Sequence, residues 1–163
     1  MKITGLKDED FVNYKKASMF IGTCKCDWKC CKEQGLDVSI CQNSELSQSK
    51  IFDMSAEDIF RRYISNPITK AIVVGGLEPF LQFGELKELI SYFRVLKCMD
   101  DIVIYTGYYK EEILDKISEL SEYPNIIVKF GRYVPNKEKH MDDVLGVFLA
   151  SENQYAERIS NID

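Results

Sequence analysis

Five of the six cysteines lie close together in the first quarter of the chain. They are Cys24, Cys26, Cys30, Cys31 and Cys41. Thiolates bind soft or borderline metals, so this segment predicts a metal centre: an iron–sulfur cluster, zinc or copper. The sixth cysteine, Cys98, ends an apolar helical pattern and is expected to be a small buried hydrophobic residue. The single histidine, His140, lies in a polar stretch, where we expect an exposed loop.

Two kinds of non-catalytic metal site could also use these cysteines. A structural zinc site would combine Cys26, Cys30 and Cys41 with either Cys24 or Cys31 as the fourth ligand. An electron-carrier cluster of the ferredoxin type would also need four cysteines. A cluster held by three cysteines, with one iron left open, fits better with the polar segments described below.

Composition and charge narrow the possible partners and compartments. The net charge is −5 and basic residues form no long run, so a nucleic-acid partner is not expected. The longest apolar run, near Ala71 to Val74, is too short to span a bilayer. The first ten residues lack an apolar signal core, so we expect a cytoplasmic protein. Thiols stay reduced in that compartment, which favours metal binding over disulfides.

The elements that must position the cysteines alternate between strand and helix along the chain. The whole chain, residues 1–163, is expected to form a single domain. Ser55 begins a helix with a capping-box pattern, and apolar spacing predicts helices near 86–96 and 111–120. Residues 151–160 are expected to close the chain as a short helix. The expected strands are 17–23, 70–74, 101–105, 125–130 and 144–150.

This alternation predicts an α/β fold: a small open partial (βα) barrel with a mostly parallel sheet of about five or six strands. A complete eight-stranded barrel needs about 250 residues, which is more than this chain has. Polar or glycine-containing segments follow each expected strand. Because the carboxyl ends of parallel strands meet on one face, these segments should converge on one site.

The cysteine segment resembles the radical S-adenosylmethionine (SAM) superfamily. Cys26-Asp-Trp-Lys-Cys30 is similar to the opening of its Cys-x3-Cys-x2-Cys signature, although Glu33 stands where the third cysteine is usual. The segment that begins with Cys41-Gln-Asn-Ser resembles the Cys-His-Asn run of glycyl-radical activating enzymes. We therefore interpret the motif as an atypical Cys-x3-Cys-x10-Cys, with Cys31 as the rival third ligand.

Later segments resemble the activating enzymes of anaerobic (class III) ribonucleotide reductase in the same order. Gly75-Gly76-Leu77-Glu78-Pro79 is similar to a Gly-Gly-Glu-Pro motif with Leu77 inserted. Residues 105–108 resemble a Tyr-Thr-Gly-Tyr segment, and residues 129–133 and 148–154 resemble two later segments. Taken alone, each glycine-containing segment also fits an ordinary turn at the end of a strand. The resemblance covers roughly residues 17–155.

The resemblance implies a [4Fe-4S] cluster held by Cys26, Cys30 and Cys41, with SAM chelating the open iron. Reductive cleavage of SAM would yield a 5′-deoxyadenosyl radical, which installs a glycyl radical on the large subunit of anaerobic ribonucleotide reductase or on another glycyl radical enzyme. An external donor such as flavodoxin or ferredoxin would supply the electron. The alternatives are another minimal radical SAM enzyme, acting on a peptide or a nucleoside, and a non-catalytic zinc or iron–sulfur module.

The resemblance also implies which residues contact SAM. Glu78 is expected to take the ammonium group, and Lys129 or Arg132 to pair with the carboxylate. Ile40 precedes the third cysteine, where the family usually places an aromatic residue near the adenine. Thr106, Ser151 and Asn153 are candidate hydrogen-bond partners of the ribose or carboxylate. The full set of expected SAM-binding residues is Ile40, Asn43, Gly75, Gly76, Glu78, Thr106, Lys129, Ser151 and Asn153.

Overall fold

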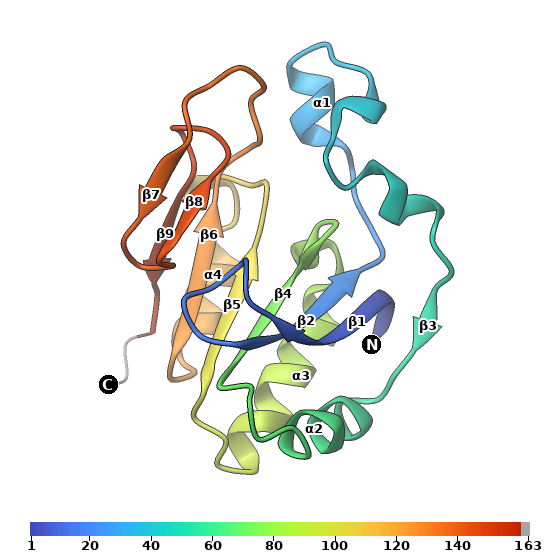
Figure 1. Cartoon of the computed structure of the whole chain (residues 1–163), viewed down its shortest axis with the longest axis vertical. Coiled ribbons are helices and arrows are strands. Elements are labelled where there is room, and N and C mark those ends of the chain that lie inside the picture. Colours follow the sequence, from blue (N-terminus) through green and yellow to red (C-terminus); the bar gives the residue numbers. More distant parts are fainter. Residues whose placement is uncertain (161–163) are drawn as a thin grey trace.

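A computed structural model describes residues 1–160 and contains a central seven-stranded sheet with a separate two-stranded hairpin (Figure 1). The strands are β1 (Lys2–Asp10), β2 (Ser18–Thr23), β3 (Phe52–Asp53), β4 (Ala71–Gly76), β5 (Asp101–Tyr105), β6 (Ile126–Phe130), β7 (His140–Asp142), β8 (Val147–Leu149) and β9 (Tyr155–Arg158). The order in the large sheet is β3-β1-β2-β4-β5-β6-β9. Strands β2, β4, β5 and β6 are parallel, and antiparallel strands form both edges.

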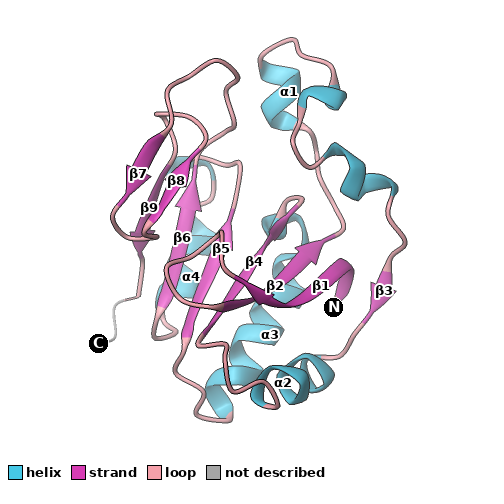
Figure 2. Ribbon diagram, viewed as in Figure 1, coloured by secondary structure: helices cyan, strands magenta, loops and turns pink. Residues whose placement is uncertain are grey.

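Helices connect the parallel strands, as the crossover between parallel neighbours requires. The α-helices are α1 (Lys29–Glu33), α2 (Ala56–Ile64), α3 (Phe83–Val95) and α4 (Leu114–Ser121). Short 3-10 helices are η1 (Val38–Ile40), η2 (Ser44–Gln48), η3 (Pro79–Gln82) and η4 (Lys110–Glu112). Figure 2 shows α2, α3 and α4 on one face of the sheet, with α1 beyond the carboxyl ends of the strands. No helix in the described part of the chain has the length and apolar character needed to cross a membrane.

Both faces of the parallel strands are buried, which explains their continuous apolar sequences. One face packs against the helices, where Ile72 and Ile104 contact a cluster that includes Phe93. The other face packs Val73 and Val103 in a second cluster. Tyr14 from the β1–β2 loop and Leu149 from the hairpin complete this second cluster. These segments cover only part of the face without helices, and a cavity remains beside them.

The mixed α/β class and the mostly parallel central sheet are confirmed, whereas the radical SAM barrel stays a prediction. The sheet pairing is open, because β3 and β9 are its two edges in the described chain. Strands β4, β5 and β6 and helix α2 lie where the sequence predicted them. Strands β1 and β3 were not predicted.

The predicted organisation of residues 144–160 is wrong in part. The expected strand 144–150 is β8, which pairs with β7 in the hairpin and does not join the main sheet. The expected closing helix at 151–160 is instead β9, an antiparallel partner of β6. His140 begins β7 and is half-buried, so it is not an exposed loop residue. Cys98 is partly buried and packs against the main core.

Candidate metal centre

A cavity of about 360 Å³ lies at the carboxyl ends of the parallel strands. It brings together the segments that follow β2, β4, β5 and β6, so the predicted convergence of these strand ends is confirmed. The cysteine segment supplies four cysteines to the lining, and the strand ends supply its charged residues, Glu78 and Lys129. The lining residues used below are Cys26, Cys30, Cys31, Ile40, Cys41, Asn43, Gly76, Glu78, Thr106, Gly107 and Lys129.

Cys26 and Cys30 flank a tight turn that leads into α1. Trp28 adopts a left-handed backbone conformation at φ 59°, and its N–H donates a hydrogen bond to Cys26 Sγ at 3.3 Å. Burial raises the pKa of Cys26 to about 12 and also raises the pKa of Cys30. A metal binds the thiolate form, so coordination would offset the cost that burial places on these thiols.

The donor set and the space around it fit an iron–sulfur cluster. All six cysteines are free of disulfides. A Cβ atom at Gly107 would lie only 2.8 Å from Cys30 Sγ, so glycine leaves room for this thiol. Within residues 1–160, no three Cys, His, Asp or Glu side chains gather closely enough to hold one metal ion. Because the irons of a cubane occupy separate corners, its ligands need not converge as tightly as the four ligands of a tetrahedral zinc.

The two rivals for the third ligand lie on the same cavity. Cys31 is 4% exposed, and burial raises its pKa, with the nearby Cys41 thiol adding to the effect. Cys41 follows η1 and is half-buried. Both residues line the cavity, so the choice of Cys41 over Cys31 as third ligand stays a prediction. Cys24 does not line the cavity, and its backbone N–H donates to Gln82 Oε1 at 2.8 Å.

Glu78 is held in the cavity wall by three donors. Its Oε1 accepts hydrogen bonds from Phe80 N–H at 3.1 Å and Thr106 Oγ1 at 2.8 Å, and its Oε2 accepts one from Gly107 N–H at 2.9 Å. The residue is 5% exposed, and burial raises the pKa of its carboxyl group. A carboxylate has about four lone-pair sites, so Oε2 retains capacity for a further donor.

Lys129 is a buried ammonium group on the same cavity. It is 6% exposed, and its Nζ donates to Gly131 O at 2.9 Å and lies 5.9 Å from the centre of the Tyr105 ring. Burial lowers its pKa to about 8. In the described chain, neither Lys129 nor Glu78 forms an ion pair. An ammonium has three donors, so two remain available on Lys129.

The other predicted SAM-binding residues differ in their relation to the cavity. Ile40, Asn43, Gly76 and Thr106 line it. Gly75 packs behind it, because a Cβ there would lie 3.1 Å from the Cβ of Tyr105. Ser151 and Asn153 do not line it: Ser151 is fully buried and accepts a hydrogen bond from Val134 N–H at 3.3 Å.

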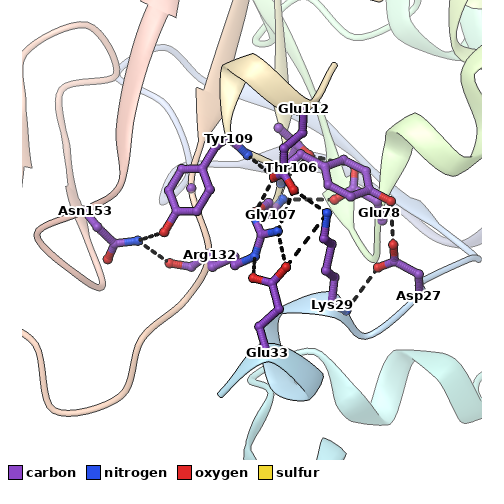
Figure 3. A network of polar contacts seen from close by, with 12 residues as sticks. Asp27, Lys29, Glu33, Glu78, Thr106, Gly107, Tyr109, Glu112, Arg132 and Asn153 are labelled. Carbon is purple, nitrogen blue, oxygen red and sulfur yellow. Dashed lines mark hydrogen bonds and ion pairs between the residues drawn. The ribbon is translucent and has the colours of Figure 1, made fainter. Parts of the chain in front are cut away.

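Arg132 is engaged in a polar network outside the cavity lining (Figure 3). Its guanidinium contacts Glu112 at 2.6 Å and Glu33 at 2.9 Å, and Asn153 Nδ2 donates to its carbonyl oxygen at 2.9 Å. This network was not predicted from the sequence. Its partners lie on separate elements, with Glu33 and Arg132 separated by 99 positions, so no local pattern could have indicated it.

Comparison with known families matches residues 15–156 to a family model described as a 4Fe-4S single cluster domain. The matched region includes the whole cysteine segment and the ends of β2, β4, β5 and β6. Comparisons with curated proteins and with solved structures found no match.

Proposed function

Because the chain belongs to the family of 4Fe-4S single cluster domains, we propose that it uses its cluster to cleave SAM reductively, with Cys26, Cys30 and Cys41 as the cluster ligands. One observation carries the proposal: a buried carboxylate and a buried ammonium, neither in an ion pair within residues 1–160, line the same cavity as these cysteines. They belong to Glu78 and Lys129.

Glu78 and Lys129 suit a zwitterionic ligand. A buried charge without a partner is costly, and burial shifts the pKa of each group towards its neutral form. A ligand with an α-ammonium and a carboxylate would satisfy both residues, and the methionyl part of SAM has this chemistry. The reduced cluster, when bound, supplies one electron that cleaves SAM into methionine and a 5′-deoxyadenosyl radical.

The chain's own residues would then bind and orient SAM. Glu78 Oε2 accepts a hydrogen bond from the ligand ammonium, while Thr106 Oγ1 donates to Glu78 Oε1 and holds it in place. Lys129 donates to the ligand carboxylate. Gly76, at φ 84°, lets the ligand approach the backbone closely. Ile40 offers an apolar contact to the adenine, and Asn43 a polar one to the ribose. Ser151 and Asn153 do not line the cavity, and both donate to the carbonyl oxygen of Arg132.

We propose that the substrate is a protein, most simply the large subunit of anaerobic ribonucleotide reductase, with a flavodoxin or ferredoxin as electron donor. The segment 105–108 supports this choice by its resemblance to the corresponding activating enzymes. Exposed apolar side chains also line the cavity: Val12 is 69% exposed, Ile40 46% and Phe148 66%. Large exposed apolar groups around an open site are typical of surfaces that bind another protein.

The direct test is SAM cleavage by the anaerobically reconstituted protein. We expect brown protein with about four irons per chain, which forms 5′-deoxyadenosine after reduction. Cys26→Ala and Cys30→Ala should abolish cleavage and lower the iron content, whereas the control Cys98→Ala should retain both. Zinc in place of iron, or a full cluster that leaves SAM intact after reduction, would contradict the proposal.

The third ligand is tested by Cys41→Ala beside Cys31→Ala. We expect Cys41→Ala to abolish cleavage and Cys31→Ala to retain it. The reverse result would assign the cluster to Cys26, Cys30 and Cys31.

The substrate is tested by mixing the active enzyme with the large subunit of anaerobic ribonucleotide reductase. We expect the doublet of a glycyl radical in the electron paramagnetic resonance spectrum. Active SAM cleavage without that doublet would instead favour a radical SAM enzyme for another peptide or a nucleoside.

A further inference from the structure

Helix α1 and the turn before it carry Cys26, Cys30 and Cys31, and a network of ion pairs fastens them to the strand ends (Figure 3). We infer that Arg132 is a positioning residue for the cluster ligands: its ion pairs with Glu33 and Glu112 order the Cys26–Cys30 turn before any cluster binds. The inference rests on the proposed assignment of Cys26 and Cys30 as ligands.

Helix α1 is too short to be stable without such contacts. It spans only Lys29–Glu33, and its N-cap residue Trp28 has left-handed backbone geometry and makes no side-chain cap. One side-chain contact serves its first turn, from Lys29 N–H to Asp27 Oδ1 at 3.1 Å. Isolated helices shorter than about 12 residues are marginal in water. The position of Cys30 and Cys31 must therefore depend on tertiary contacts.

Arg132 supplies the central contact. Its side chain is 5% exposed, and it binds Glu112 through two parallel contacts, Nη1 to Oε2 at 2.6 Å and Nη2 to Oε1 at 2.8 Å. Nη2 also donates to Glu33 Oε1 at 2.9 Å, which reaches the last residue of α1. The guanidinium lies 4.8 Å from the centre of the Tyr109 ring, which fixes its plane. The fork geometry of arginine suits this double contact better than lysine would.

Further contacts fasten the same turn at both ends. Lys29 forms an ion pair with Glu112. Tyr108 donates through its hydroxyl to Asp27 Oδ2 at 2.6 Å. Gln34 Nε2 donates to Cys30 O at 2.7 Å and to Tyr133 O at 2.9 Å. Apart from the Gln34–Cys30 bond within the segment, each contact joins the turn or α1 to a segment that follows β5 or β6.

Residues 38–49 have no ion pair and no hydrogen bond to the strand ends in the described chain. Their hydrogen bonds to oxygen join groups no more than four positions apart. The Cys41 backbone N–H also donates to the Cys31 thiol, which is a contact within the cysteine segment. The structure therefore divides the ligands into an ordered pair, Cys26 and Cys30, and a third thiol on a locally bonded segment.

Amide hydrogen exchange on the cluster-free protein tests the inference. We expect residues 29–34 to be protected in the wild type and residues 42–48 to exchange faster. Glu33→Gln weakens the network from its exposed end, since the Glu33 side chain is 45% exposed. It should raise exchange in residues 29–34 by about three- to tenfold, and Arg132→Lys should raise it further. Asp8→Asn is the matched control, because it weakens the Arg62–Asp8 surface ion pair on another part of the chain.

A second readout is the rate at which a chelator removes iron from the loaded protein. We expect faster loss from Glu33→Gln than from the Asp8→Asn control. If residues 29–34 exchange as fast as residues 42–48 in the cluster-free wild type, or if both network variants match wild type, the inference is overturned. If Arg132→Lys does not fold, the results for Glu33→Gln alone decide whether the inference holds. Neither readout uses SAM, so a failure of SAM cleavage would leave this result standing.

Discussion

Glu78 and Lys129 are two charged residues that the fold buries beside the cysteines without an ion-pair partner among residues 1–160. Glu78 already accepts three hydrogen bonds from the chain, so its orientation is fixed before a ligand arrives. Lys129 has one such bond. Side chains that already hold their bound orientation lose less conformational entropy when a ligand binds. At the scale of single residues, the site therefore presents charges that are fixed in place but unpaired.

Replacing Glu78 with glutamine should weaken SAM binding without removing the cluster. Glu78→Gln keeps the side-chain shape but removes the charge that would bind the ligand ammonium. A hydrogen bond to a charged group contributes about 1.5–3 kcal/mol, so we expect the dissociation constant to rise by about ten- to a hundredfold. Equilibrium dialysis of SAM against the loaded protein measures this change.

Glu45→Gln serves as the control, since Glu45 is exposed on η2. Iron content should match wild type in both variants. If Glu78→Gln kept full iron content and bound SAM as tightly as wild type, Glu78 would not bind the ligand ammonium. The proposed zwitterion site would then be contradicted.

Individual site residues could be predicted from the sequence where they belong to a short local motif. Glu78 and Thr106 were selected from motifs at the ends of β4 and β5, and both line the cavity. Arg132 was expected from the resemblance as an alternative to Lys129 for pairing with the SAM carboxylate. The structure places it between Glu33 and Glu112, and these contacts join residues far apart in the sequence. Such long-range pairs have no local signal.

At the scale of elements, prediction succeeded where apolar runs were continuous. Strands β4, β5 and β6 are buried on both faces and have strong signals. Strand β1 was missed because most of its residues are charged or polar, and pairing with β2 rather than intrinsic propensity makes it a strand. Strand β9 was mistaken for a helix because its four residues show no clear alternation.

The N-terminal cap of α2 allows a test of how much one hydrogen bond at a helix start contributes to stability. Ser55 Oγ accepts a hydrogen bond from Asp58 N–H at 3.0 Å, as the capping pattern predicted. Ser55→Ala should lower the free energy of unfolding by about 0.5–2 kcal/mol, because an amide at the helix start loses its acceptor. Urea unfolding followed by circular dichroism measures the change.

Ser65→Ala, at the other end of α2, is the comparison. Its hydroxyl donates to Arg62 O, a group that water can also satisfy, so we expect a loss below about 0.5 kcal/mol. Equal losses in the two variants would show that the cap is not what begins this helix.

At the scale of the whole molecule, Asp101 joins three parts that are distant in the sequence. It begins β5, and its carboxylate accepts hydrogen bonds from Tyr14 at 2.9 Å, from Lys16 at 2.5 Å and from Arg158 at 2.9 Å. The first two lie in the β1–β2 loop that covers the face without helices, and Arg158 ends β9. This single side chain therefore fastens the loop and the edge strand to the sheet, opposite the end that holds the cysteines (Figure 1).

The environment of Asp101 predicts a pH dependence of stability. Burial alone would raise its pKa, but hydrogen bonds from Lys16, Arg158 and Tyr14 outweigh burial and lower the pKa below the ordinary value of 3.8. A carboxyl group whose pKa is lowered by folding contributes stability above its unfolded pKa, and loses that contribution as the pH falls through the folded pKa. The stabilisation should therefore be complete at neutral pH and should fade only below about pH 4.

Asp101→Asn isolates this contribution. At neutral pH we expect the variant to unfold with a free energy lower by about 1–3 kcal/mol, because it loses charged hydrogen bonds to Lys16 and Arg158. The gap between wild type and variant should narrow as the pH is lowered from about 4 towards 3, because the unfolded wild-type carboxyl then binds a proton more readily than the folded one. Urea unfolding at several pH values measures the gap, and Asp143→Asn, at an exposed position, provides the control. A gap that stays constant down to about pH 3 would mean that Asp101 acts through packing and not through its charge, because only the charged form titrates in this range.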